Sequence, residues 1–149
     1  MAKFATRFLG AVVALAVLAA SVRPAEPAAV AKVDNKLVGT WKCISAKYGG
    51  QEVNRPEGFT QLKHVTPTHF MWATFGADGK VISALGGSYT LKGNDYVETP
   101  EYWVGEGLDE LKGKRQEFTW KVEGNKWHHN GKLSTGLTIE EVWERVERK

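Results

Sequence analysis

The chain has 149 residues, a length typical of one domain, and a formal net charge of +3. Two of these three net charges fall before Lys36, so the remainder is nearly neutral and contains no strongly basic segment. Nucleic-acid binding needs a clustered basic face, and the composition therefore argues against a nucleic-acid partner. Cys43 is the single cysteine, which excludes an internal disulfide and favours a buried thiol.

The first 21 residues have the pattern of a secretory signal peptide. Lys3 and Arg7 form a basic start, an apolar run follows over 8–20, and small residues around Ala20 suit a cleavage site. The run is too short to span a bilayer comfortably, and no cysteine follows it for lipid attachment. We predict a periplasmic or secreted protein with no stable membrane anchor after the leader is removed.

The segment 22–35 is rich in alanine, contains prolines and has no aromatic residue. Such a composition is typical of a flexible spacer. The folded domain is therefore predicted over 36–149, which is long enough for one hydrophobic core.

From Lys36 onward, strand-like segments alternate with turns rich in Gly, Asn, Asp and Pro. Eight strands are predicted, over 37–47, 59–65, 68–75, 81–91, 96–104, 114–122, 126–130 and 137–146, with one short helical turn at 108–111. Strands linked in this way form either a closed up-and-down barrel or a sandwich. An eight-stranded barrel has room for one small ligand.

Several motifs together carry a resemblance to a known family. A Gly-x-Trp sequence opens the first strand at Gly39, and an arginine, Arg145, lies in the last strand. More specific is the set formed by 66–72, 86–89, 96–98 and 141–145. Over 37–148 the chain resembles a bacterial lipocalin-like domain family of unknown function, within the calycin superfamily. The resemblance implies an all-β, eight-stranded antiparallel up-and-down barrel and no established activity.

The resemblance also implies structural roles for two residues. In lipocalins the tryptophan of the first strand plugs the closed end of the barrel. An arginine from the last strand packs across it in a cation–π contact. Trp41 and Arg145 are the matching residues here.

Alternation along each strand assigns side chains to faces. If Trp41 points inward, so does Ser45, and in the next strand His64 points inward while Lys63 points outward. The candidate ligand-binding residues selected from these faces are His64, His69, Tyr96, Glu98, Tyr102, Trp120, His129 and Glu141. Of these, we expect Tyr96, Glu98, His69 and Glu141 to converge on one interior site.

A buried carboxylate must be paired, hydrogen-bonded or protonated. So many interior polar groups therefore predict a wet pocket; the alternative is a solid core in which Glu98 and Glu141 bond to tyrosines, histidines or Arg145. His64 and His69 are expected to face each other across a hairpin. Two histidines could bind a metal, but spacing fixes no third ligand, so neither a metal site nor a cofactor is predicted.

We predict a monomeric binding protein for a small hydrophobic or amphipathic ligand. Two alternatives are a structural or protein-interaction barrel with a filled core, and an enzyme using a His/Glu proton-transfer pair. Haem binding through a histidine is a more remote variant of the ligand-binding hypothesis. No catalytic residues are assigned, because the sequence contains no established catalytic motif.

Overall fold

The alternation of strands and turns produces one continuous antiparallel sheet in the computed structural model, which describes residues 36–147. The predicted signal peptide (1–21) and spacer (22–35) lie outside the described residues. The strands are β1 (Gly39–Tyr48), β2 (Gln51–Glu52), β3 (Thr60–Val65), β4 (His69–Phe75), β5 (Val81–Lys92), β6 (Asp95–Val104), β7 (Gln116–Glu123), β8 (Lys126–Lys132) and β9 (Thr138–Arg145). A 3-10 helix, η1 (Asp109–Leu111), occupies the position of the predicted helical turn.

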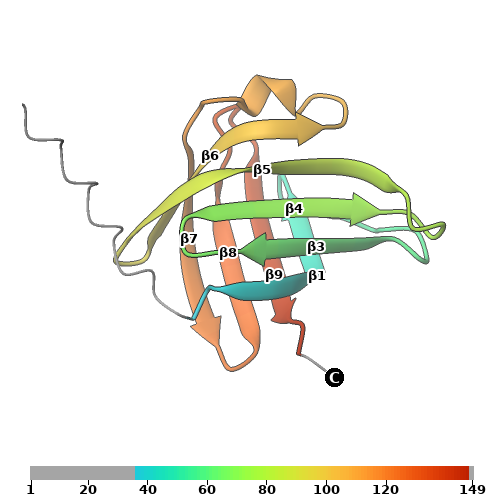
Figure 1. Cartoon of the computed structure of the whole chain (residues 1–149), viewed down its shortest axis with the longest axis horizontal. Coiled ribbons are helices and arrows are strands. Elements are labelled where there is room, and N and C mark those ends of the chain that lie inside the picture. Colours follow the sequence, from blue (N-terminus) through green and yellow to red (C-terminus); the bar gives the residue numbers. More distant parts are fainter. Residues whose placement is uncertain (1–35, 148–149) are drawn as a thin grey trace, which may run out of the picture.

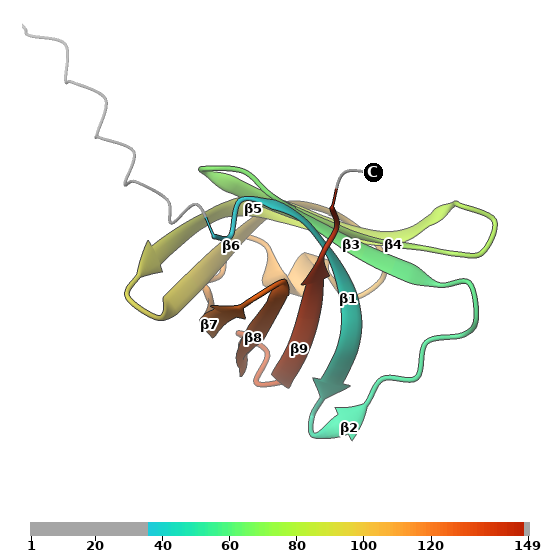
Figure 2. The same ribbon diagram turned by 90° about the horizontal axis from the view of Figure 1, so that it is seen from below.

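The sheet closes on itself. Each long strand pairs with its neighbour in the chain, and β1 pairs with β9 to complete the ring, while the two-residue β2 only extends the edge of β1. Figures 1 and 2 show β3 to β6 crossing β7 to β9, with the strongly curved β1 joining the two groups. The β1–β9 pairing confirms the eight-stranded up-and-down barrel and excludes the sandwich.

A β-bulge in β1 turns Ser45 outward, so its predicted inward orientation is wrong. The register between β1 and β9 shifts between Cys43 and Ser45, and a bulge of this kind adds one residue without a cross-strand partner. Ser45 is consequently exposed, whereas Ala46 is buried and Tyr48 turns toward the interior. Strict alternation holds from Gly39 to Cys43 only.

Trp41 and Arg145 close one end of the barrel. The Trp41 side chain is fully buried, its indole N–H donates to the carbonyl of Leu37 at 2.9 Å, and Arg145 Cζ lies 4.0 Å from its ring centroid. Arg145 also donates to the carbonyls of Lys36 and Val38, so it fastens the entry to β1. This is the arrangement that the lipocalin resemblance implies.

Gly39 makes this plug possible. Its φ of +145° is rarely adopted by residues with a side chain, and a Cβ there would lie 2.5 Å from Arg145 Nη1. The glycine of the Gly-x-Trp motif therefore leaves room for the arginine that covers the tryptophan.

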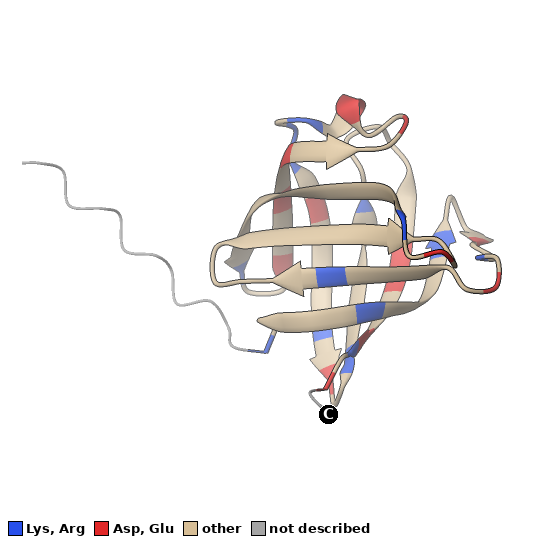
Figure 3. Ribbon diagram, turned by 45° about the vertical axis from the view of Figure 1, so that its right-hand side comes forward, with Lys and Arg blue, Asp and Glu red and all other residues tan. Residues whose placement is uncertain are grey.

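Charged residues are distributed unevenly along the strands of the barrel (Figure 3). β4 carries no Lys, Arg, Asp or Glu, whereas three charged side chains on other strands are buried: Lys63 on β3, Glu98 on β6 and Glu141 on β9. Within residues 36–147, no helix has the length and apolar character needed to cross a membrane. The three interior charges define the site described next.

Candidate functional site

A cavity of about 230 Å³ occupies the barrel interior on the side away from the Trp41 plug. Its outer part is surrounded by Ile139 and by three leucines from two loops: Leu108 follows β6, and Leu133 and Leu137 follow β8. The deeper lining is formed by the polar side chains Gln61, Lys63, Glu98, Gln116, His129 and Glu141. The cavity therefore has an apolar rim and a polar base, the combination that small-molecule sites commonly show.

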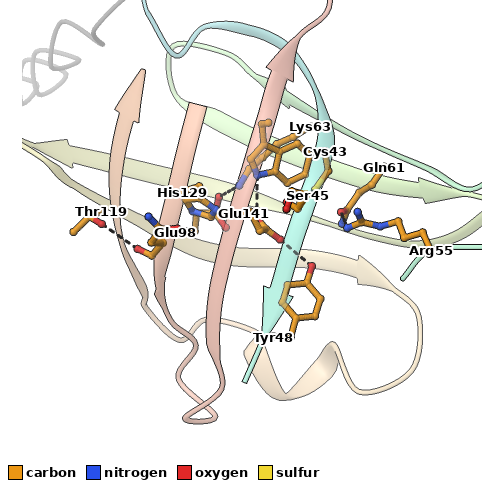
Figure 4. A network of polar contacts seen from close by, with 12 residues as sticks. Cys43, Ser45, Tyr48, Arg55, Gln61, Lys63, Glu98, Thr119, His129 and Glu141 are labelled. Carbon is orange, nitrogen blue, oxygen red and sulfur yellow. Dashed lines mark hydrogen bonds and ion pairs between the residues drawn. The ribbon is translucent and has the colours of Figure 1, made fainter. Parts of the chain in front are cut away.

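Glu141 is the centre of the polar base (Figure 4). Its Oε1 accepts a hydrogen bond from the Tyr48 hydroxyl at 2.9 Å, and its Oε2 lies 3.0 Å from both His129 Nδ1 and Trp143 Nε1. Burial alone would raise the pKa of this carboxyl. The hydrogen bond from His129, the charge of Lys63 and the hydrogen bond from Tyr48 outweigh burial and lower the pKa of Glu141 below its usual value, so Glu141 is a carboxylate at neutral pH.

His129 is held as a neutral imidazole. Its exposure is 1%, and burial together with the nearby Lys63 charge lowers its pKa despite the opposing effect of Glu141. Because Glu141 can only accept, the imidazole proton lies on Nδ1 and Nε2 keeps a lone pair. Among the described residues, no hydrogen-bond donor reaches His129 Nε2. The cavity base therefore contains a vacant hydrogen-bond acceptor.

Lys63 and Glu98 form a second interior pair. Lys63 Nζ lies 2.5 Å from Glu98 Oε1, and the two side chains are 1% and 5% exposed. The ammonium is surrounded by four aromatic rings at 5.0–5.5 Å, those of Phe70, Tyr96, Trp127 and Trp143. Cation–π attraction is strongest where the charge is desolvated, so these rings offset part of the cost of burying the ammonium.

Four of the eight candidate residues meet in the interior. Tyr96 is fully buried, its ring centroid lies 5.5 Å from that of His129, and burial followed by the charge of Glu98 raises its pKa. Glu98, His129 and Glu141 line the cavity itself. The expected convergence of Tyr96, Glu98 and Glu141 is therefore observed, with His129 as an additional member.

The two histidines of the β3–β4 hairpin are outside the barrel, contrary to the sequence prediction. Val65 pairs with Phe70 across the hairpin, and both side chains are buried, so His64 and His69 face solvent. His64 pairs with Met71 and His69 with Ser88, so the two histidines are not opposite each other. In residues 36–147, no group of three His, Cys, Asp or Glu side chains could hold a metal ion.

Tyr102 is also misplaced by the sequence prediction, and Trp120 lies outside the cavity lining. A register shift between Gly86 and Gly87 puts Tyr102 on the outer surface, where its ring packs over Gly86; a Cβ at Gly86 would lie 2.4 Å from that ring. Trp120 keeps its predicted face of β7 and packs half-buried against the core, with its indole N–H donating to the carbonyl of Gly93 at 3.2 Å, but it does not line the cavity.

Lys63, Tyr48 and Trp143 are site residues that sequence reasoning did not select as ligand contacts. The register error at His64 turned Lys63 outward, and the bulge at Ser45 hid the inward turn of Tyr48. A usable signal for Lys63 existed in the apolar pair Val65 and Phe70. Placing both of these inward also brings Lys63 inside by alternation.

Comparisons with known proteins identify the fold. No family model matches the chain, and no curated protein matches it. A lipocalin-like protein from Bacteroides uniformis matches with a TM-score of 0.53 at 13% identity, over 74% of this chain and 99% of that one. An uncharacterised protein from Bacteroides eggerthii matches with a TM-score of 0.52 at 13% identity, over 73% and 98%. At such low identity the likeness concerns the fold alone, and that fold is the closed lipocalin-like barrel.

Proposed function

We propose that this protein is an exported barrel that holds one small, partly apolar ligand in its interior cavity. The observation that carries the proposal is the combination of an apolar rim with buried, charged side chains at the cavity base. A polar end of the ligand would contact this base, and an apolar part would lie among the leucines of the rim.

The cost of burying the charged residues at the cavity base favours a binding role for the barrel over a filled structural core. Buried ion pairs are often no more stabilising than apolar residues of similar volume, because desolvation offsets the attraction between the charges. Lys63, Glu98 and Glu141 are all at most 6% exposed, and they line open volume. Charges kept beside a cavity are explained by recognition more directly than by stability.

Export is supported by the basic start, apolar run and small residues of 1–21. An exported carrier would meet its ligand outside the cytoplasm. The mature chain would begin between Ala20 and Lys36, ahead of the first strand.

One measurement tests both halves of this proposal: native mass spectrometry of the protein isolated from the periplasm or medium of the cell that makes it. The polypeptide mass is expected to correspond to a start between Ala20 and Lys36. An additional mass from a small molecule is expected under native conditions, and it should disappear after denaturation.

Two tryptophan variants provide matched controls. Leu133→Trp should fill the rim of the cavity and remove the additional mass, whereas Met71→Trp, on the outer surface, should retain it. An exported chain that still begins at Met1 would contradict signal-peptide cleavage. A wild-type protein with the same mass as Leu133→Trp, after correction for the substitution, would contradict ligand binding.

A further inference from the structure

The hydrogen-bonding inventory of the cavity base restricts the chemistry of the ligand. Both oxygens of Glu141 already accept hydrogen bonds from Tyr48, His129 and Trp143. Glu98 is paired with Lys63. Two buried atoms of residues that line the cavity, His129 Nε2 and Glu98 Oε1, have no hydrogen-bond partner among the described residues. Glu98 Oε1 lies 2.5 Å from the ammonium of Lys63, which has three hydrogens for this one carboxylate. The groups left for a ligand are therefore His129 Nε2, which needs a donor, and Lys63, which has hydrogens to spare.

We propose that the polar end of the ligand is an uncharged group that both donates and accepts hydrogen bonds, such as a hydroxyl, bound at His129 Nε2 and Lys63. This inference rests on the proposed ligand-binding function and defines the class of ligand. A hydroxyl donates one hydrogen bond and accepts others, so a single group satisfies both residues.

The net charge of the cavity base argues against an anionic group at the polar end of the ligand. The ammonium of Lys63 is balanced by Glu98, and Glu141 adds one further negative charge, while His129 is neutral. A carboxylate would add a second net negative charge to a desolvated site and would leave His129 Nε2 without a donor. Leaving a buried acceptor unpaired costs about 1–3 kcal/mol.

A cationic end is also disfavoured. An ammonium would offset the net negative charge of the cavity base and could donate to His129 Nε2, but it has no acceptor for the hydrogens of Lys63. It would also place a like charge near the Lys63 ammonium, inside the same set of aromatic rings. An uncharged group that both donates and accepts is the class that pairs with His129 Nε2 and Lys63 together and places no like charge beside Lys63.

Cavity size limits the probe that can test this inference. At ~30 Å³ for each water-sized group, 230 Å³ holds roughly eight such groups. Benzyl alcohol, toluene, benzoate and benzylamine are of this size, and they share one ring while differing in the end group. Binding of all four to the exported full-length mature chain can be followed by NMR at neutral pH.

Benzyl alcohol is expected to bind about tenfold or more tightly than each of the other three probes, because only it completes both residues. Its binding should also move the ¹⁵N resonance of His129 Nε2, and toluene should leave that resonance in place. His129→Phe should reduce the preference for benzyl alcohol over toluene to near unity. The Nε2 resonance of the wild type tests the same contact if this variant does not fold.

The outcomes separate the two proposals. Tighter binding of benzoate or benzylamine, or equal binding of toluene and benzyl alcohol, would overturn the uncharged end group and leave ligand binding intact. Failure of all four probes to bind, with identical flat titrations for the wild type and Leu133→Trp, would overturn the end group together with the ligand-binding proposal.

Discussion

Replacing Lys63 by methionine is expected to lower the free energy of unfolding by about 3–5 kcal/mol, the usual cost of removing one partner of a buried ion pair. Methionine keeps much of the length of the lysine side chain and removes its charge. Glu98 would then remain 4% exposed, without its cation, beside Tyr96 and the other rings of the interior. Urea unfolding of the variant and the wild type measures the difference.

A double-mutant cycle distinguishes the ion pair from simple loss of packing. Lys63→Met combined with Glu98→Gln should regain much of the stability, because the stranded carboxylate is gone. Lys121→Met is a matched surface control: its 2.6 Å pair with Glu123 is exposed, and such pairs contribute little. The account of the interior pair would be wrong if Lys63→Met changed the urea midpoint no more than Lys121→Met does.

Replacing Trp41 by alanine is expected to cost about 3–5 kcal/mol, the range for truncation of a large buried aromatic side chain. The indole is fully buried, packs edge-on against Trp127 at 5.5 Å, and supports the guanidinium of Arg145. Its removal would leave a void at the closed end of the barrel and expose the interior to water from that side. The midpoint of urea unfolding should fall while its m-value stays the same.

Trp120→Ala provides the comparison for this variant. Trp120 is half-buried, so its truncation exposes less new apolar surface than that of Trp41. The free energy of unfolding should therefore fall less for Trp120→Ala than for Trp41→Ala. An unchanged midpoint for Trp41→Ala, or a larger loss for Trp120→Ala, would contradict the role of Trp41 as the plug.

The strands were predictable because their signals are local. Turn residues bound each strand, and alternation gave the correct faces in β8 and β9. In β9, Ile139, Glu141 and Trp143 all point inward as predicted, and in β8 the side chains of Trp127 and His129 do so. Those two strands supplied the His129–Glu141 half of the interior cluster.

The remaining errors arise from features that alternation cannot register. A bulge adds one residue and reverses the faces beyond it, which explains the errors at Ser45 and Tyr102. Burial of Lys63 depends on Glu98, which lies on another strand far away in the sequence. A partner of this kind becomes visible only when the barrel is closed. The apolar pair Val65 and Phe70 indicates that Lys63 points inward, but it does not indicate which carboxylate balances its charge.

The pH dependence of stability follows from the same cluster. The pKa values of His129 and Glu141 are both lowered in the folded protein, so the unfolded chain binds more protons than the folded one as the pH falls. Their contributions to stability are present above the unfolded values of 6.5 and 4.5 respectively, and they are lost as the pH falls toward the lowered folded values. The sign is the same for both groups, so acid weakens the fold.

The central claim is that the cavity base holds a neutral, Glu141-bound imidazole with a vacant Nε2, and ¹⁵N NMR of His129 during a pH titration tests it most directly. The account predicts a proton on Nδ1 and a neutral ring that persists as the pH falls below 6.5, the ordinary histidine value. The ring should gain its second proton at lower pH, in parallel with loss of stability. A ring that titrates near 6.5 while the protein remains folded, or one that carries its proton on Nε2, would contradict the claim.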